Sequence, residues 1–192
     1  MRHIATLVAA LGISVLLGGC VAATPGPVGE PLAPGVSLIL PDKPVFAGGL
    51  VVNQLVQARF QDRHQVFQSF IEAGTNRFSI VMSVPSGPRI MKINWSKGSV
   101  SAQKEPIAPE ALSARRMLAD LMLVYASADV LRAALKGGTL EVDAKGTRSI
   151  VRDGTPVIVV TRPSGDAWSG RSALINHAFD YELNIQSQRV SP

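Results

Sequence analysis

The chain has few of the residues on which several classes of protein depend. It contains a single cysteine, which excludes an intrachain disulfide framework and a four-cysteine zinc site. Aromatic residues make up only 5% of its 192 residues, which argues against a surface that stacks on nucleic-acid bases. The formal charge is +5, but the basic residues are scattered and only Arg115 and Arg116 are adjacent. We therefore expect no nucleic-acid partner.

Residues arranged for catalysis or metal binding are also missing from the sequence. After His3, the histidines are His64 and His177, and neither has a metal-ligand spacing to aspartate, glutamate or cysteine. His177 precedes the last predicted strand and Asp180 lies near its start, and residues three apart along a strand face opposite sides. A Gly-x-Ser-x-Gly nucleophile motif and a phosphate-binding loop are both missing. We predict no enzyme activity, no catalytic residue, no metal and no cofactor.

The first twenty residues have the pattern of an export signal. Arg2 and His3 precede an apolar run of about 14 residues, too short to cross a bilayer. The run ends in Leu17-Gly18-Gly19-Cys20, which resembles the lipobox of bacterial prolipoproteins. This resemblance implies that residues 1–19 are a signal peptide and that Cys20 is lipidated. The alternative is an ordinary secretory signal, which would leave a free thiol in an oxidising compartment.

Prolines dominate the next segment. Six prolines alternate with glycine and small residues between Val21 and Pro44, a density that disfavours helices and central strands. We predict that residues 20–45 are a lipid-anchored tether in which residues 38–40 are the one apolar patch able to dock on the domain. Val21 follows Cys20 in place of the aspartate that retains such lipoproteins at the inner membrane. The lipobox resemblance therefore implies an outer-membrane location, facing the periplasm.

Alternation of apolar and polar residues predicts strands in both halves of a domain over residues 46–187, followed by a short tail at 188–192. In the first half we expect strands over 54–61, 64–72, 78–84 and 90–95, with a turn over 85–88. In the second half we expect strands over 140–142, 147–152, 157–160 and 179–185, with a hairpin turn at Asp153-Gly154.

Between the two sets of strands the periodicity changes to that of a helix. Pro109 and Glu110 predict the start of a helix, whose apolar face includes Leu118, Leu121, Met122 and Tyr125. Either Ser127 or Asp129 is suited to cap a second short helix that runs through Leu135.

These elements predict a mainly β (α+β) fold in which a curved antiparallel sheet is covered by a short helical lid. The space beneath such a lid is either filled by side chains or left as a cavity for an apolar ligand, and periodicity does not decide between the two. The candidate cavity residues are Phe60, Phe78, Ile80, Met82, Trp95, Leu118, Leu121, Met122, Phe179, Tyr181 and Leu183.

The order of these features resembles the bacterial lipoproteins of the DUF3261 family. The resemblance is carried by the lipobox, a glutamine-rich first strand, the helical segment 118–123 and the closing segment 176–185. That family is similar to the lipoprotein-localisation carriers and receptors (LolA/LolB-like), whose fold is a half-open antiparallel β-barrel with a lid over a lipid-binding cavity. The resemblance implies that this protein binds an acyl or aryl-polyene-type lipid for transport or localisation to the outer membrane.

Two positions depart from that pattern. The receptor exposes a leucine in a Pro-Leu-Gly turn, whereas the matching turn here is Pro85-Ser86-Gly87, so the membrane-inserting tip is missing. Asp180 stands where a glycine is expected before Tyr181, which should affect only the local strand geometry. Two alternatives stay open: an acceptor for lipoproteins delivered by a soluble periplasmic carrier, and an envelope scaffold with a filled core.

Overall fold

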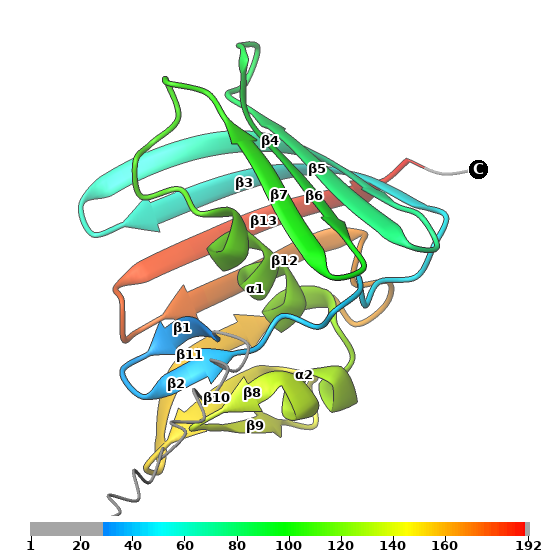
Figure 1. Ribbon diagram of the computed structural model, residues 1–192. Coiled ribbons are helices and arrows are strands. Elements are labelled where there is room, and N and C mark those ends of the chain that lie inside the picture. Colours follow the sequence, from blue (N-terminus) through cyan, green and yellow to red (C-terminus); the bar gives the residue numbers. More distant parts are fainter. Residues whose placement is uncertain (1–28, 191–192) are drawn as a thin grey trace, which may run out of the picture.

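The computed structural model describes residues 29–190, which form two antiparallel sheets and two helices (Figure 1). The signal peptide, Cys20 and the first part of the predicted tether lie outside the described residues. The strands of the larger sheet are β3 (Leu50–Phe60), β4 (Arg63–Ala73), β5 (Arg77–Ser83), β6 (Arg89–Ser96), β7 (Ser99–Lys104), β9 (Thr139–Val142), β10 (Arg148–Arg152), β11 (Thr155–Thr161), β12 (Gly170–Asn176) and β13 (Tyr181–Arg189).

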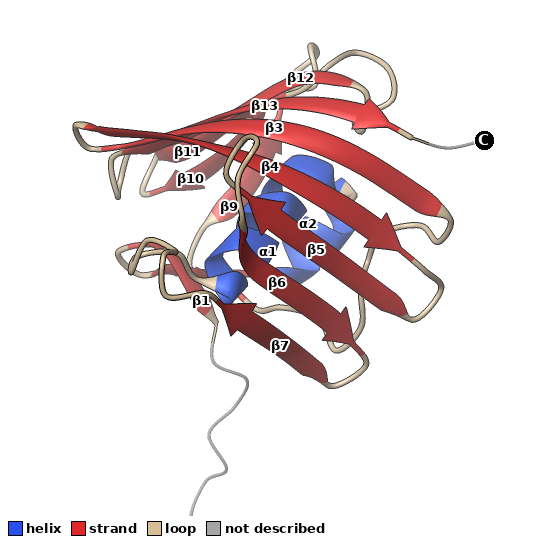
Figure 2. Ribbon diagram, turned by 90° about the horizontal axis from the view of Figure 1, so that it is seen from above, coloured by secondary structure: helices blue, strands red, loops and turns tan. Residues whose placement is uncertain are grey.

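The larger sheet is one antiparallel layer with the strand order β7-β6-β5-β4-β3-β13-β12-β11-β10-β9. Strands β7 and β9 are its free edges, so the sheet does not close on itself. It is strongly curved, and both helices lie on its concave side (Figure 2). The predicted mainly β fold, with a large antiparallel sheet and two helices, is therefore confirmed.

Two strands of the larger sheet, β7 and β12, are not predicted from the sequence, for different reasons. Strand β7 is an edge strand whose side chains are almost all exposed, so it has no apolar alternation. Strand β12 buries Ser172 and Asn176 on the same face as Leu174, so two polar residues interrupt its inward pattern. Asn176 is buried because its amide is hydrogen-bonded, and a buried polar residue of this kind looks like a surface residue in the sequence.

The two ends of the last strand also differ from the prediction. Strand β13 begins at Tyr181, because residues 177–180 form a turn in which Asp180 has a φ of 47°. Aspartate is one of the residues that tolerate this left-handed conformation. The strand continues through Arg189, so the predicted tail at 188–192 begins too early. His177 and Asp180 therefore belong to a turn rather than to a strand.

The first helix, α1 (Ala114–Tyr125), starts later than its sequence predicts. Ser113 is the N-cap, and its hydroxyl accepts a hydrogen bond from the backbone N–H of Arg116. Pro109 instead belongs to a turn, closed by a bond from the Leu112 N–H to the Pro109 carbonyl. In the second helix, α2 (Ala128–Ala134), Ser127 is the N-cap, which decides between the two predicted capping residues.

Part of the predicted tether is a folded hairpin. Strands β1 (Glu30–Ala33) and β2 (Val36–Leu38) pair with each other, and β2 pairs with β8 (Leu135–Lys136) in a second small sheet. Leu32 and Leu38 are fully buried. The predicted tether boundary at residue 45 is therefore wrong. Pro31 does not prevent the pairing, because β1 is an edge strand and proline is tolerated there.

The carboxyl end of α1, which has no basic residue in its last turn, is covered by the buried Arg148 of β10 and by the half-buried Arg162, which follows β11. Arg148 donates hydrogen bonds of 2.8 and 2.7 Å to the carbonyls of Leu123 and Ala126. Arg162 donates a longer one of 3.4 Å to the carbonyl of Val124. Burial, followed by the charge of Arg162, lowers the pKa of Arg148 to about 10, so it stays a cation at the negative end of the helix dipole.

The buried apolar side chains of both sheets and both helices form a single cluster, from Leu32 in β1 to Ile185 in β13. Residues 29–190 therefore hold a complete core, and a chain that begins at Val21 keeps all of it. Within these residues, neither helix is long and apolar enough to cross a membrane.

Candidate functional site

A cavity of about 790 Å³ lies between α1 and the concave face of the larger sheet. Its walls come from β3, β4, β5 and β13, from α1, and from the turn that precedes α1. The inward positions of β3 form its long wall, with Gln54 at one end and Phe60 at the other. Most of the wall between them is apolar, including Val56, Ala58 and Ile71.

Seven of the eleven predicted cavity residues line this space: Phe60, Ile80, Met82, Leu121, Phe179, Tyr181 and Leu183. The other four are fully buried in the core and do not form its wall: Phe78, Trp95, Leu118 and Met122. Phe78 shares the inward face of β5 with Ile80 and Met82, but the ring of Phe46 covers it at a centroid distance of 4.7 Å. Alternation identifies an inward position, but not whether another side chain fills the space above it.

The Gln54 end of the cavity is closed by a buried polar network. The Gln54 amide nitrogen donates to the Tyr125 hydroxyl at 2.8 Å and to the Ser187 hydroxyl at 3.0 Å. The Tyr125 ring in turn stacks on Trp168 with a centroid distance of 3.8 Å. Sequence reasoning missed Gln54, although the alternation of side chains along β3 places it on the same inward face as Val52 and Val56.

The opposite end of the cavity carries a second polar group, in which sequence reasoning identified Tyr181 but missed Asp120 and Arg116. The Tyr181 hydroxyl donates a 2.7 Å hydrogen bond to the carboxyl of Asp120, which is buried on α1. Arg116, one turn earlier on the same helix, places its Nε 3.4 Å from the Glu30 carboxylate. Its guanidinium lies 5.0 Å from the ring centroid of Phe179 and 5.8 Å from that of Tyr181.

Asp120 is the most perturbed carboxyl at this end. Burial raises its pKa to about 7, against the opposing effects of the Tyr181 hydrogen bond and the Arg116 charge. Burial and the neighbouring Asp120 carboxyl raise the pKa of Tyr181, so its hydroxyl keeps its proton and acts as the donor. Burial therefore favours the protonated form of Asp120 well above the pH at which an exposed aspartate ionises.

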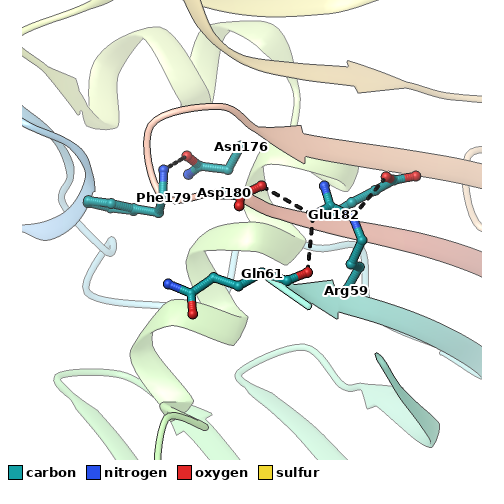
Figure 3. A network of polar contacts seen from close by, with 6 residues as sticks. All are labelled: Arg59, Gln61, Asn176, Phe179, Asp180 and Glu182. Atoms are coloured by element: carbon teal, nitrogen blue, oxygen red, sulfur yellow. Dashed lines mark hydrogen bonds and ion pairs between the residues drawn. The ribbon is translucent and has the colours of Figure 1, made fainter. Parts of the chain in front are cut away.

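The turn that carries Phe179 is fixed from both sides (Figure 3). Arg59 pairs with the Asp180 carboxylate at 3.2 Å, and the Gln61 backbone N–H donates to the Asp180 carbonyl at 3.1 Å. On the other side, the Asn176 side-chain oxygen accepts a 2.9 Å bond from the Phe179 N–H. These bonds hold the Phe179 ring at the rim of the cavity.

Asn176 also connects this turn to the first hairpin. Its side-chain nitrogen donates a 2.8 Å hydrogen bond to the carbonyl of Leu32, and the residue is 1% exposed. One amide therefore ties β12, the rim turn and β1 together, which keeps Glu30 beside Arg116. This role explains why an asparagine occupies an inward position of β12.

The part of the chain that the structure describes contains no group of three or more histidine, cysteine, aspartate or glutamate side chains placed to hold a metal. Residues 51–189 match the family described as "Protein of unknown function (DUF3261)". The chain belongs to this family. The matched range begins within β3 and includes both helices and β13, so this DUF3261 domain contains most of the cavity wall. No curated protein matches the chain.

Proposed function

We propose that this DUF3261 protein is a lipid-anchored lipoprotein of the outer membrane, facing the periplasm, that binds an acyl or aryl-polyene-type lipid. The observation that carries the proposal is the largely apolar cavity of about 790 Å³ beneath α1. Small-molecule sites have volumes of roughly 300–1,000 Å³, whereas a well-packed core leaves few voids larger than a water molecule. A curved, open sheet with helices over its concave face also supports the LolA/LolB-like, half-open-barrel interpretation.

The ligand is bound and carried rather than chemically altered. Several polar groups of the cavity wall are held by other side chains: Tyr181 by Asp120, the Arg116 Nε by Glu30, and Gln54 by its two hydroxyl partners. Catalysis requires a nucleophile or base with free access to substrate. Ser113, a hydroxyl in the cavity wall, serves as the N-cap of α1. We therefore propose transport or localisation of the ligand as the role.

Two other functions use the same anchored chain. An acceptor for lipoproteins from a soluble carrier would also need the cavity, but the exposed β5–β6 turn presents Ser86 where such a receptor inserts a leucine. An envelope scaffold would need only the outer surface, and the cavity favours a ligand-binding role over it.

Filling the cavity tests the proposed binding. Ala58 lies in the cavity wall, and Gln57, the residue before it in β3, is exposed on the opposite face. We expect Ala58→Phe to weaken binding of a fluorescent fatty acid about tenfold or more, because a phenyl ring occupies ligand space. Gln57→Phe adds the same ring outside the cavity and should bind like the unmodified chain. Equal binding by both variants, with folding confirmed by circular dichroism, would contradict the proposal.

The anchor is tested separately, by Cys20→Ser in the full chain. Only a thiol accepts the diacylglycerol, so the variant should remain an uncleaved or mislocalised precursor. Three acyl chains anchor a protein firmly, whereas one chain binds only marginally. A processed Cys20→Ser protein that still fractionates with the outer membrane would exclude the lipobox.

A further inference from the structure

The guanidinium of Arg116 makes fewer polar contacts than it can. Of its five N–H donors, the one on Nε faces Glu30 at 3.4 Å, and Nη1 is buried with no hydrogen-bond partner among the described residues. The rings of Phe179 and Tyr181 hold the guanidinium in place without accepting conventional hydrogen bonds. Buried donors are normally satisfied, and Arg116 lines the cavity with its side chain 22% exposed, so its guanidinium has spare capacity for an acceptor there.

The positive charge of Arg116 is not fully balanced at this end of the cavity, so an anion can bind there. The Glu30 carboxylate is 3.4 Å from Arg116 and 3.9 Å from Arg115, so one negative charge faces two positive charges. Asp120 adds a negative charge only when it is ionised, and burial raises its pKa to about 7. With Asp120 protonated, Arg116 faces the Glu30 carboxylate that it shares with Arg115, so its positive charge is only partly balanced. The neighbouring hydroxyl of Tyr181 keeps its proton and adds no charge.

The other side of the rim does not offer a site for an anion. Arg59 lies 3.2 Å from Asp180 and 3.8 Å from Glu182, so one positive charge faces two negative ones there. The Asp180 side chain is 65% exposed, and its charge is screened by solvent. A negatively charged head is therefore directed to Arg116 rather than to Arg59.

The shape of the cavity places an apolar tail next to this charged group. Tyr181 pairs with Phe60 in the register of β13 and β3, and Ser187 pairs with Gln54. The polar rim and the closed end are thus six residues apart on β3, about 20 Å at 3.3 Å per residue. Between them the wall presents apolar side chains such as Val56 and Leu183. A tail can lie along this wall while its head stays at Arg116.

We infer that the ligand is an anionic amphiphile, with a carboxylate or phosphate head bound by Arg116 and an apolar tail along β3. The inference rests on the proposed lipid-binding function and deepens it, because neutral lipids of the same chain length should bind more weakly. Arg116 is the residue that binds the head group. Tyr181 packs against its guanidinium and donates a hydrogen bond to Asp120.

The test uses three probes with the same sixteen-carbon tail: palmitate, hexadecyl phosphate and hexadecanol. Their affinities for the chain that begins at Val21 are measured by displacement of a fluorescent fatty acid. A hydrogen bond to a charged group corresponds to roughly a 10- to 100-fold change in affinity. We expect at least one of the two anions to bind tighter than hexadecanol by about this factor, and the preferred anion identifies the head.

Variants assign the preference to one side chain. Arg116→Gln should lose the preference for the anion while its affinity for hexadecanol is unchanged, and Arg116→Lys should keep most of it. Arg115→Gln is the matched control, because Arg115 also faces Glu30 but does not line the cavity. It removes the same charge and should keep the preference.

The outcomes separate the two proposals. If hexadecanol binds the unmodified chain as tightly as both anions, the inference is wrong and the proposed lipid binding stands. If none of the three probes binds, the proposed function itself is contradicted. Equal loss of the preference in Arg115→Gln and Arg116→Gln would also overturn the inference, because it would indicate a general effect of charge. The comparison of probes on the unmodified chain decides the question even if Arg116→Gln fails to fold.

Discussion

The buried carboxyl of Asp120 makes the stability of this protein depend on pH in a way that one substitution should remove. Its pKa is 3.8 when unperturbed and about 7 in the folded chain, chiefly because burial disfavours the charged form. The folded state therefore binds this proton more tightly than the unfolded state does. The free energy of unfolding falls as the pH rises from about 4 through 7, and none of this penalty is present in acid.

The magnitude follows from the two pKa values. Each pKa unit between the folded and unfolded chain corresponds to about 1.36 kcal/mol, so ionised Asp120 costs about 4 kcal/mol by about pH 8. Asn at this position cannot ionise, and its side-chain oxygen can still accept the bond from Tyr181. We expect Asp120→Asn to be nearly neutral at about pH 4 and more stable than the unmodified chain by up to about 4 kcal/mol at about pH 8.

Urea unfolding of the chain that begins at Val21, followed by the fluorescence of Trp95 and Trp168, measures this difference at each pH. Asp143→Asn is a control of opposite sign. The Asp143 carboxylate accepts 2.8 Å bonds from the backbone N–H groups of Thr147 and Lys145, which lower its pKa. Its loss should therefore destabilise the chain at neutral pH and not in acid. A stability difference for Asp120→Asn that does not change with pH would refute the reasoning.

Two further predictions concern the helix end and the β5–β6 turn. Arg148→Met should cost about 2–5 kcal/mol in urea unfolding, because it leaves the buried carbonyls of Leu123 and Ala126 without their donors; an unchanged midpoint would show that these bonds contribute nothing. Ser86→Leu should increase co-sedimentation of the unlipidated chain with liposomes, since a fully buried leucine contributes roughly 1.5–3 kcal/mol. Its stability should change little, because Ser86 already places a Cβ at a φ of 53° on an exposed turn. Strong binding by the unmodified chain would instead favour the lipoprotein-acceptor alternative.

Local patterns in the sequence were enough for most of the sheet, and they narrowed the cap of α2 to two residues. Strands with one apolar face, such as β5 and β13, show a period of two that requires no knowledge of their partners. Ser127 before α2 is a local capping signal of the same kind. Seven cavity residues, including Leu121 and Leu183, were found because they are apolar and point inward.

The parts that sequence reasoning missed depend on contacts between distant residues. The β1–β2 hairpin is apolar only at a few positions among prolines, and it is held by β8 and by Asn176, 144 residues from Leu32. Asp120 and Tyr181 are 61 residues apart, so nothing local marks them as a pair. Polar residues with buried partners look like surface residues until the partners are known.

The sequence by itself determined which apolar residues of the regular strands and of α1 face the inside of this protein, because the side-chain period of a strand or helix assigns each residue to a face. Only the tertiary structure decided what that inside contains. Phe78 and Ile80 face the same side of β5, but the Phe46 ring covers Phe78, which is part of the core. Ile80 borders the cavity instead. The distance between a helix and a sheet is set by every side chain packed between them, and no single strand carries that information.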